Sequence, residues 1–331
     1  MEWLYHCVGK RKLMPTKHLQ VAIASDANYA GIASIFLISL FENNKEFNKI
    51  TVHLLSNAIP VSALGIIRQS VLEGKGELIV HDVSDLQKRL GTDIPPTISI
   101  SAYSRLFLSS VLPKEIEKVL YMDVDAVVDG SLYALWSMNM GDHQVGGVLD
   151  DVPSYAKEKV GLNAESPYLN SGFLLVNLQK WREEHIEEKM LHYLAEHHGN
   201  VYHHDQGLIN AVCNRKLFLP VNYNMVTNFF VFPYRSLRQV PFYTREEIEE
   251  GKSHPVFIHF TAGVANRPWI KGCRHPLKNV FLKYRAKSLY RDQPLRRDNR
   301  PEKLRLLSFM YYHARPCYYG MLKLRSLIKE T

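Results

Sequence analysis

Apolar and polar residues alternate along the first part of the chain in a way that predicts strands and helices in turn. Apolar runs typical of buried strands cover 19–24, 50–56 and 77–80. A run of small and apolar residues over 30–41 and helical spacing over 61–73 predict two helices between them. This strand–helix–strand–helix–strand order predicts a parallel sheet with helices on both faces, an α/β fold.

The rest of the pattern adds elements of both kinds. Further predicted strands cover 119–122, 145–149, 173–178, 217–221 and 256–260. Further predicted helices cover 101–112, 132–136, 179–198, 205–214 and 276–289. Asp205 is expected to cap the helix that it opens. Loops are predicted over 91–100 and 153–167, and a polar linker over 292–301.

Two carboxylates follow the predicted strand 119–122 directly, at Asp123 and Asp125. A carboxylate is costly to bury unless it is paired or bound to a cation. Side chains two residues apart in an extended segment point to the same face, so this pair can converge on one Mn²⁺ or Mg²⁺. An isolated Asp-x-Asp is usually turn chemistry. The apolar strand before it and Val127-Val128 behind it favour the metal interpretation.

Other polar residues also stand at the ends of predicted strands. Asp26, Asp82 and Asp123 could share one rim of the sheet, where parallel sheets bind their ligands. Asn28 and Tyr29 add an amide and an aromatic face that can recognise a base, although a turn with a helix cap explains them equally well. No GxGxxG or GxxxxGK[ST] motif occurs, which argues against a dinucleotide site or a P-loop.

A third candidate ligand stands far along the chain, at the end of the strand 256–260. His259 could complete a metal site with the two aspartates, or could be an ordinary buried histidine. Gly263 and Arg267 follow it closely. A glycine that lets backbone approach a ligand and a fixed cation suit a leaving diphosphate, although a surface loop has the same composition.

Two further polar clusters precede apolar elements. Asn170-Ser171-Gly172 and His204-Asp205-Gln206 offer amide and carboxylate groups that could bind sugar hydroxyls, and both are equally compatible with turns and helix caps. The neighbouring histidines His203 and His204 lack helical metal-ligand spacing, so we interpret them as non-ligands.

Composition excludes several classes of protein. The chain has 331 residues, of which 46% are hydrophobic and 22% charged, as in ordinary globular proteins. Its four cysteines are scattered, which argues against a zinc site or a disulfide framework and fits a reducing compartment. The longest apolar run is too short to span a bilayer, and no apolar segment typical of a secretory signal follows the basic residues near the N-terminus.

The net charge of +8 comes from one end of the chain. From Lys283 to Thr331 there are 13 Lys and Arg against four Asp and Glu, and aromatic residues alternate with the basic ones after Lys303. This pattern indicates either a helix on an anionic membrane surface or a helix packed on the core. A nucleic-acid site is disfavoured because no RNA- or DNA-binding motif accompanies the charge.

Several motifs occur in a fixed order along the chain: ASDANY, YSRL, KVLYMDVDAVV, NSGFLLVNLQKW, HDQGLIN and IHFTAG with RPW. Together they resemble the motifs of glycosyltransferase family 8. The similarity covers about 19–284, most of the chain. It implies a GT-A-type fold, in which a Rossmann-like nucleotide-sugar-binding sheet carries helices on both faces. We expect an irregular extension over 1–17, the catalytic domain over 18–290 and a basic, aromatic helical tail over 291–331.

The resemblance also implies an activity. It is that of a retaining hexosyltransferase, which uses Mn²⁺ or Mg²⁺ to move galactose or glucose from a UDP-hexose to a saccharide or glycolipid acceptor. The expected setting is bacterial lipopolysaccharide or surface-polysaccharide synthesis in the cytoplasm, on the inner face of the membrane if the tail binds lipid. The choice between galactose and glucose stays open.

Individual positions match residues of known role in the family. The positions that match metal ligands are Asp123, Asp125 and His259. Those that match donor-binding residues are Ala24, Asp26, Asn28, Tyr29, Arg105, Val124, Asp150, Asn170, Gly263 and Arg267. Those expected to assist the reaction itself are Gln206, Asp205 and Arg267.

The chain departs from the family pattern in a few places. It has Arg267-Pro268-Trp269 where the family usually has Lys-Pro-Trp, and the loop before Arg267 is slightly longer than usual. Because Arg keeps the charge and adds a bidentate fork, we expect the function to survive. Ala27 replaces a common acid, and Asp205-Gln206-Gly207 lacks a second one.

Two alternatives from other classes remain at this point. A sugar nucleotidyltransferase would normally carry a glycine-rich, basic loop after the first strand, which 25–31 does not. A non-catalytic nucleotide-sugar-binding scaffold would have no need of Asp123, Asp125 and His259 together.

Overall fold

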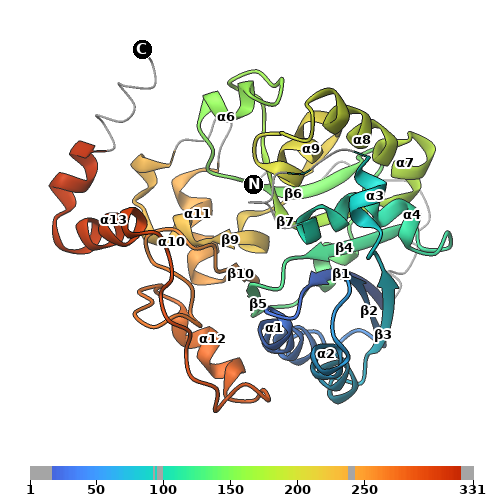
Figure 1. Cartoon of the computed structure of the whole chain (residues 1–331), viewed down its shortest axis with the longest axis horizontal. Helices are drawn as coiled ribbons and strands as arrows, with labels where there is room; N and C mark the ends of the chain where they lie inside the picture. The colour runs from blue at the N-terminus through green and yellow to red at the C-terminus, as the bar shows by residue number, and fades with distance from the viewer. Residues whose placement is uncertain (1–16, 92–93, 95–99, 238–242, 322–331) are drawn as a thin grey trace.

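The computed structural model describes residues 17–91, 94, 100–237 and 243–321 (Figure 1). Its centre is a seven-stranded sheet in the order β3-β2-β1-β4-β7-β6-β8. The strands are β1 (His18–Ser25), β2 (Lys49–Ser56), β3 (Glu77–Asp82), β4 (Lys118–Met122), β6 (Val145–Leu149), β7 (Leu169–Asn177) and β8 (Lys216–Phe218). The predicted α/β class is confirmed.

Strand direction is parallel with one exception. The strands β3, β2, β1 and β4 run parallel, as predicted, and β6 runs parallel to β8. The strand β7 is antiparallel to both of its neighbours, β4 and β6. It also starts earlier than predicted, at Leu169, so Asn170, Ser171 and Gly172 lie within the strand rather than in a turn before it.

Helices cover both faces of the sheet (Figure 1). On one face lie α1 (Ala30–Glu42) and α2 (Val61–Glu73), whose predicted bounds are confirmed to within one residue. On the other face lie α7 (Leu178–Glu183), α8 (Ile186–Glu196) and α9 (His204–Val212). The short helices are α3 (Leu86–Leu90), α4 (Leu108–Val111), α5 (Tyr133–Trp136) and α6 (Ser154–Glu158).

Two helix predictions need correction. The long helix expected over 179–198 is divided between α7 and α8, because His185 adopts a left-handed backbone with φ of 53°. The helix expected over 101–112 starts as a 3₁₀ helix, η1 (Ile100–Phe107), before the short α4. The predicted loop over 91–100 lies almost wholly outside the described residues.

A second, three-stranded sheet brings residues 257–259 to the end of β4. It consists of β5 (Ala126–Val128), β10 (Phe257–His259) and β9 (Met225–Val226), of which β5 and β9 were not predicted. The strand β10 is antiparallel to β5, and the amide of Phe260 donates to the Asp125 carbonyl at 2.9 Å. This pairing carries His259 to the aspartates across more than a hundred residues of chain.

The C-terminal third adds α10 (Thr227–Val231), α11 (Arg245–Ser253), α12 (Lys278–Arg285) and α13 (Glu302–His313), with 3₁₀ turns η2 (Val221–Asn224) and η3 (Tyr234–Ser236). From α12, Phe281 and Tyr284 are fully buried in a small core shared with α1 and β10. From α13, Tyr311 is buried and its hydroxyl donates to the Val231 carbonyl at 2.6 Å. Within the described residues, no helix is long and apolar enough to cross a membrane.

Candidate active site

Asp123, Asp125 and His259 meet at the carboxyl end of β4. Each offers a ligand atom, and these atoms lie within 4.8 Å of one another. The His259 Nε2 atom lies 3.1 Å from Asp125 Oδ1 and 3.9 Å from Asp123 Oδ2. Two carboxylates and an imidazole form a donor set that suits Mn²⁺, and their mutual distances leave room for one ion. The residues present therefore fit the expected metal.

Glycine at position 172 makes this arrangement possible. A Cβ atom built there would lie 2.3 Å from His259 Cε1 and 2.9 Å from Asp123 Oδ2. The backbone of β7 thus passes directly behind the candidate metal ligands, and any larger residue would push them apart. The Gly172 carbonyl also accepts from the Asp123 amide at 2.8 Å, which fixes the start of the Asp-x-Asp turn.

The orientation of His259 is set by Asn224, a residue that the sequence did not single out. The Oδ1 atom of Asn224 lies 3.2 Å from His259 Nδ1, and its Nδ2 atom donates to Asn170 Oδ1 at 2.8 Å. Because Oδ1 can only accept, Nδ1 carries a proton, and Nε2 is the ring nitrogen that faces the aspartates. Such a second layer fixes the tautomer of a metal-binding histidine.

Arg105 anchors the opposite side of the cluster. Its Nη2 donates to Asp123 Oδ1 at 2.9 Å, its Nε lies 3.1 Å from Asp205 Oδ2, and its Nη1 donates to the Ser171 carbonyl at 2.6 Å. Burial alone would lower the pKa of Arg105, but the charges of Asp123 and Asp205 outweigh burial and raise it. The guanidinium therefore stays charged and buried beside the aspartate.

Asp205 is not a helix cap, contrary to our prediction. The residue before α9 is His203, in a left-handed conformation with φ of 59°, and Asp205 lies in the first turn. Its carboxylate accepts from Ser171 Oγ at 2.9 Å and pairs with Arg105 instead. Burial is the main reason that the pKa of Asp205 is raised.

Asp150, Asn170 and Gln206 form one hydrogen-bonded group beside the cluster. Asn170 Nδ2 and Gln206 Nε2 both donate to Asp150 Oδ2, at 3.0 and 2.9 Å. Gln206 Oε1 accepts from the Ser171 amide at 3.1 Å. Hydrogen bonds therefore run from His259 through Asn224 and this group to Ser171 and Arg105, so the site is held as one network.

Arg267 reaches the same cluster from the loop after β10. Its Nη2 donates to Asp125 Oδ2 at 3.1 Å, and its Nε donates to the Phe260 carbonyl at 3.2 Å. Burial would raise the pKa of Asp125, but the charge and hydrogen bond of His259, followed by Arg267, lower it to about 2. Gly263 lies in this loop with φ of +43°, a conformation that favours glycine.

The turn after β1 lies next to Arg267. Asp26 Oδ1 accepts from the Tyr29 amide at 2.9 Å, so the turn interpretation of this motif is correct as far as Asp26 is concerned. The Tyr29 ring stands edge-on to Trp269, with centroids 6.2 Å apart. Ala24 belongs to the end of β1, and Val124 is buried between the two aspartates. Asp82 ends β3 at the sheet edge, with β2 and β1 between it and β4, and is not a member of the cluster.

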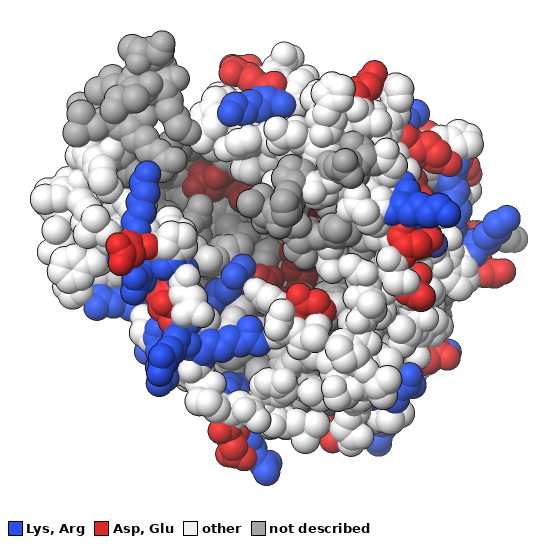
Figure 2. Space-filling view, viewed as in Figure 1, with Lys and Arg blue, Asp and Glu red and all other residues white. Residues whose placement is uncertain are grey.

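The surface over this region is hollowed. Figure 2 shows a depression between the part built from α10 to α13 and the part built on the large sheet, with acidic side chains inside it. Lys and Arg side chains gather along the wall on the α13 side (Figure 2). An acidic floor beside a basic wall can hold a cation and an anion together.

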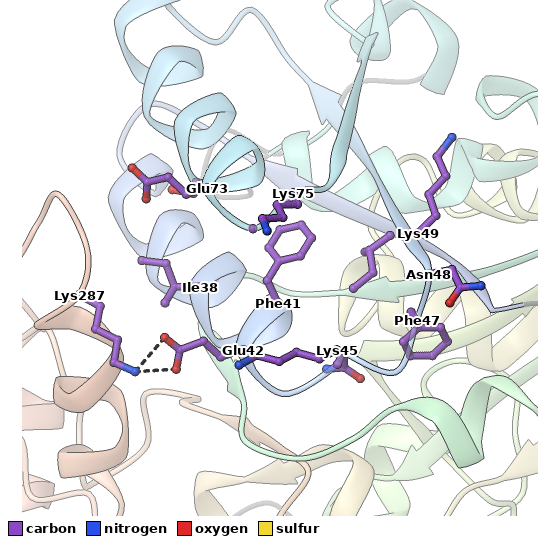
Figure 3. Close-up of a pocket in the computed structure, with 14 residues that line it drawn as sticks. Ile38, Phe41, Glu42, Lys45, Phe47, Asn48, Lys49, Glu73, Lys75 and Lys287 are labelled. Carbon is purple, nitrogen blue, oxygen red and sulfur yellow. Dashed lines mark hydrogen bonds and ion pairs between the residues drawn. The ribbon is translucent and has the colours of Figure 1, made fainter.

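A separate pocket of about 550 Å³ contains none of the predicted site residues. It lies between the C-terminal ends of α1 and α2 and the start of β2, over Ile38 and Phe41 (Figure 3). The ion pair between Lys287 and Glu42, at 2.6 Å, crosses its edge (Figure 3). This pocket is at the amino ends of the strands, away from the rim where parallel sheets bind ligands.

The chain is similar in sequence to known proteins. Residues 20–273 match the family model described as Glycosyl transferase family 8. A lipopolysaccharide 1,2-glucosyltransferase of Escherichia coli is 25% identical over 295 residues, which cover 86% of this chain and 83% of that protein. General stress protein A of Bacillus subtilis is 21% identical over 80% of this chain and 92% of its own length.

A solved structure shares the fold. The galactosyltransferase LgtC, in complex with donor and acceptor sugar analogues, superposes with a TM-score of 0.70 at 23% identity. The match covers 87% of this chain and 99% of LgtC, and it supports the GT-A-type architecture. Since the family model spans most of the chain, including both aspartates and His259, the protein belongs to glycosyltransferase family 8.

Proposed function

We propose that the protein is a retaining hexosyltransferase, which moves galactose or glucose from a UDP-sugar to a saccharide acceptor in lipopolysaccharide or surface-polysaccharide synthesis. The observation that carries this proposal is the convergence of Asp123, Asp125 and His259, with the Arg267 guanidinium beside them. A divalent cation and a guanidinium together suit the departure of a diphosphate.

In this proposal Asp123, Asp125 and His259 hold the metal. When bound, Mn²⁺ or Mg²⁺ supplies Lewis-acid stabilisation of the charge that develops on the departing diphosphate. Arg267 leaves its contact with Asp125 and donates to a β-phosphate oxygen, and the Gly263 backbone lies along the diphosphate. The charge-assisted bonds of a guanidinium to phosphate are strong enough for this exchange.

The donor then lies along the rim of the sheet. Ala24, Asp26, Asn28 and Tyr29 bind the uridine, and Val124 packs beside it. Arg105 contacts the diphosphate and the sugar, and Asp150 and Asn170 bind the sugar hydroxyls. The last two are already linked by a hydrogen bond of 3.0 Å, so their amide and carboxylate are oriented before the sugar binds.

The reaction takes place on one face of the sugar. No two carboxylates of this group are free to serve as a glycosidase-type nucleophile and acid/base pair, because Asp123 and Asp205 pair with Arg105 and Asp125 pairs with Arg267. We propose that the bond to UDP breaks as the acceptor oxygen attacks, and that the leaving phosphate takes the acceptor's proton. Gln206 is better placed to assist than Asp205, since it is half-buried whereas Asp205 is buried.

A thermal-shift comparison tests this function against its alternatives. UDP with Mn²⁺ at saturating concentration is expected to raise the Tm by about 5 °C, because a ligand that binds only the folded state stabilises it. ATP with Mg²⁺ is expected to leave the Tm unchanged. A shift with ATP and Mg²⁺ alone would indicate a nucleotidyltransferase, and no shift with either would contradict a nucleotide-dependent transferase.

We also propose that the protein binds the cytoplasmic face of the membrane through its C-terminal tail. One side of α13 packs on the protein through Tyr311, while Leu304, Leu306 and Phe309 are 47%, 56% and 60% exposed. Basic residues flank them at Lys303 and Arg305. Leu306 and Phe309 are three residues apart and share one face of the helix, and an exposed apolar face with flanking cations suits an anionic lipid surface. The part of the predicted tail from 322 onward lies outside the described residues.

Sedimentation with lipid vesicles tests this location. The protein is expected to sediment with vesicles that contain anionic phospholipid and to remain in solution with neutral ones. Phe309→Asp should weaken this binding about 10-fold, because it removes an aromatic contact with the lipid and adds repulsion between a carboxylate and the anionic headgroups. Leu72→Asp, at a 61% exposed position on α2, is the matched control and should bind normally. Equal binding by all three proteins would contradict attachment through α13.

A further inference from the structure

The segment between α12 and α13, predicted as a polar linker, is fastened to both loops of the candidate donor site. The amide of Arg296 donates to the Trp269 carbonyl at 2.8 Å, and the Arg296 carbonyl accepts from the Lys271 amide at 2.8 Å. These bonds form a parallel bridge between Ile270 and Arg296. We call residues 296–300 the strap.

Arg300 links the strap to the loop that carries Gly263 and Arg267. Its Nη1 donates to the Gly263 carbonyl at 2.8 Å and to Ser308 Oγ, in the middle of α13, at 3.1 Å. Its Nε and Nη2 donate to the two oxygens of Asp298, at 2.9 and 2.8 Å. The Arg300 side chain is only 17% exposed, so the guanidinium is a fixed junction and not a mobile surface group.

Arg296 links the same strap to the turn after β1. Its Nη2 donates to the Asn28 carbonyl, and its guanidinium lies 6.0 Å from the centre of the Tyr29 ring. The two arginines, four residues apart, therefore reach two loops that are more than two hundred residues apart in sequence. The Arg274 amide also donates to the Ala265 carbonyl at 2.8 Å, which adds a further bond to the loop that carries Gly263 and Arg267.

From these contacts we propose that two residues of the strap, Arg300 and Arg296, are positioning residues for the diphosphate and uridine ends of the donor site. Arg300 holds the Gly263 loop in the position from which Arg267 meets the diphosphate, and Arg296 holds the Asn28–Tyr29 turn against the base. This inference rests on the function proposed above. It also extends the catalytic unit past residue 290, into the segment that the sequence assigned to the tail.

The different roles of Arg300 and Arg296 can be distinguished by measuring nucleotide affinities. Arg300 acts only on the part of the site that binds the β-phosphate, so its loss should weaken UDP more than UMP. Arg296 acts on the part that binds the base, so its loss should weaken UDP and UMP alike. A variant that merely damaged folding would lower the Tm and all affinities together, without changing their ratio.

Isothermal titration with UDP and with UMP, each with Mn²⁺, tests the proposal on the full chain. Arg300→Ala is expected to bind UDP about 10-fold more weakly, with little change in the affinity for UMP. A loss of this size is usual when one hydrogen bond from a charged group is removed. Arg300→Lys should recover part of the loss, because an ammonium can still donate to the Gly263 carbonyl. Arg296→Ala should weaken both ligands by a similar factor.

The matched control is Arg297→Ala in the middle of the strap. Arg297 is exposed and makes no hydrogen bond or ion pair within the part of the chain that the structure describes, so its removal should change neither affinity. Hydrogen exchange gives a second readout, in which the backbone amides of 261–267 should exchange faster in Arg300→Ala than in Arg297→Ala.

The outcomes separate the two proposals. If the wild-type protein binds UDP with Mn²⁺ and Arg300→Ala keeps the wild-type ratio of UDP to UMP affinity, the role of the strap is wrong and the proposed function stands. If the wild-type protein binds neither nucleotide, the proposed function fails and the strap proposal fails with it. If Arg300→Ala does not fold, Arg300→Lys and Ser308→Ala carry the same test.

Discussion

Asp125→Asn should lower the rate of hexose transfer by more than about 100-fold, which exceeds the loss usual for a second-layer partner of a metal. The carboxylate is buried, 3.1 Å from His259 Nε2 and 3.1 Å from Arg267 Nη2. An amide of the same shape keeps the packing but removes the charge that binds a hard cation. Initial rates with a UDP-sugar and saturating Mn²⁺ measure the effect.

The control for this variant is Asp142→Asn. Asp142 is 85% exposed and pairs with Lys180 on the surface, so the same chemical change there should leave the rate within about 2-fold of wild type. Circular dichroism of Asp125→Asn should match that of the wild-type protein, which would show that the fold survives. A near-normal rate for folded Asp125→Asn would exclude the aspartate as a metal ligand.

Arg267→Ala should reduce kcat by about 100- to 1,000-fold, the range for removal of one group that stabilises charge in a transition state. The guanidinium donates to Asp125 at 3.1 Å through Nη2 and to the Phe260 carbonyl at 3.2 Å through Nε. It can therefore move from one anion to another over a short distance. Steady-state kinetics with the UDP-sugar that gives the highest rate measure the change in kcat and KM.

Arg267→Lys distinguishes charge from geometry. Lysine keeps the positive charge without the fork of the guanidinium, so we expect this variant to stay within about 10-fold of wild type. Lys271→Ala is the control for removing an exposed cation from the same loop and should behave as wild type. If Arg267→Ala is as active as Lys271→Ala, the guanidinium has no part in the departure of UDP.

The strands and helices that could be predicted are those with strong local patterns. The apolar runs of β1 and β2 and the spacing of α2 are local signals, so their bounds were predicted to within about one residue. The two short strands β5 and β9 have only three and two residues. They exist because they pair with β10, and such pairing has no signature in a short window of sequence.

Backbone conformations set by tertiary packing were missed for a similar reason. His185 and His203 adopt left-handed conformations that residues other than glycine rarely take, and the sequence around them contains no signal for this. Asp205 stands where a capping residue is usual, but a bond to Ser171 and an ion pair with buried Arg105 satisfy it instead. Tertiary charge pairing outweighed local capping preference here.

The residues of the candidate site likewise include some that local spacing predicts and some that only tertiary pairing brings together. Asp123 and Asp125 could be predicted as a pair because spacing alone places them on one face. His259 was also named as a candidate ligand from the sequence, but its approach to the aspartates depends on which strands pair, and sequence spacing does not report this. The same holds for Asn224 and the strap, which the sequence did not single out. Asn224, Arg296 and Arg300 stand in stretches with no motif, and only their contacts at 3.2 Å or less identify them.

Pulsed EPR of Mn²⁺ bound with UDP tests most directly whether the three residues form the metal site. We expect nitrogen coupling from a single imidazole in the wild-type complex, since His259 offers the one nitrogen ligand in the cluster. The coupling should disappear in His259→Gln. A wild-type spectrum without nitrogen coupling, or coupling that persists in His259→Gln, would show that His259 does not bind the metal.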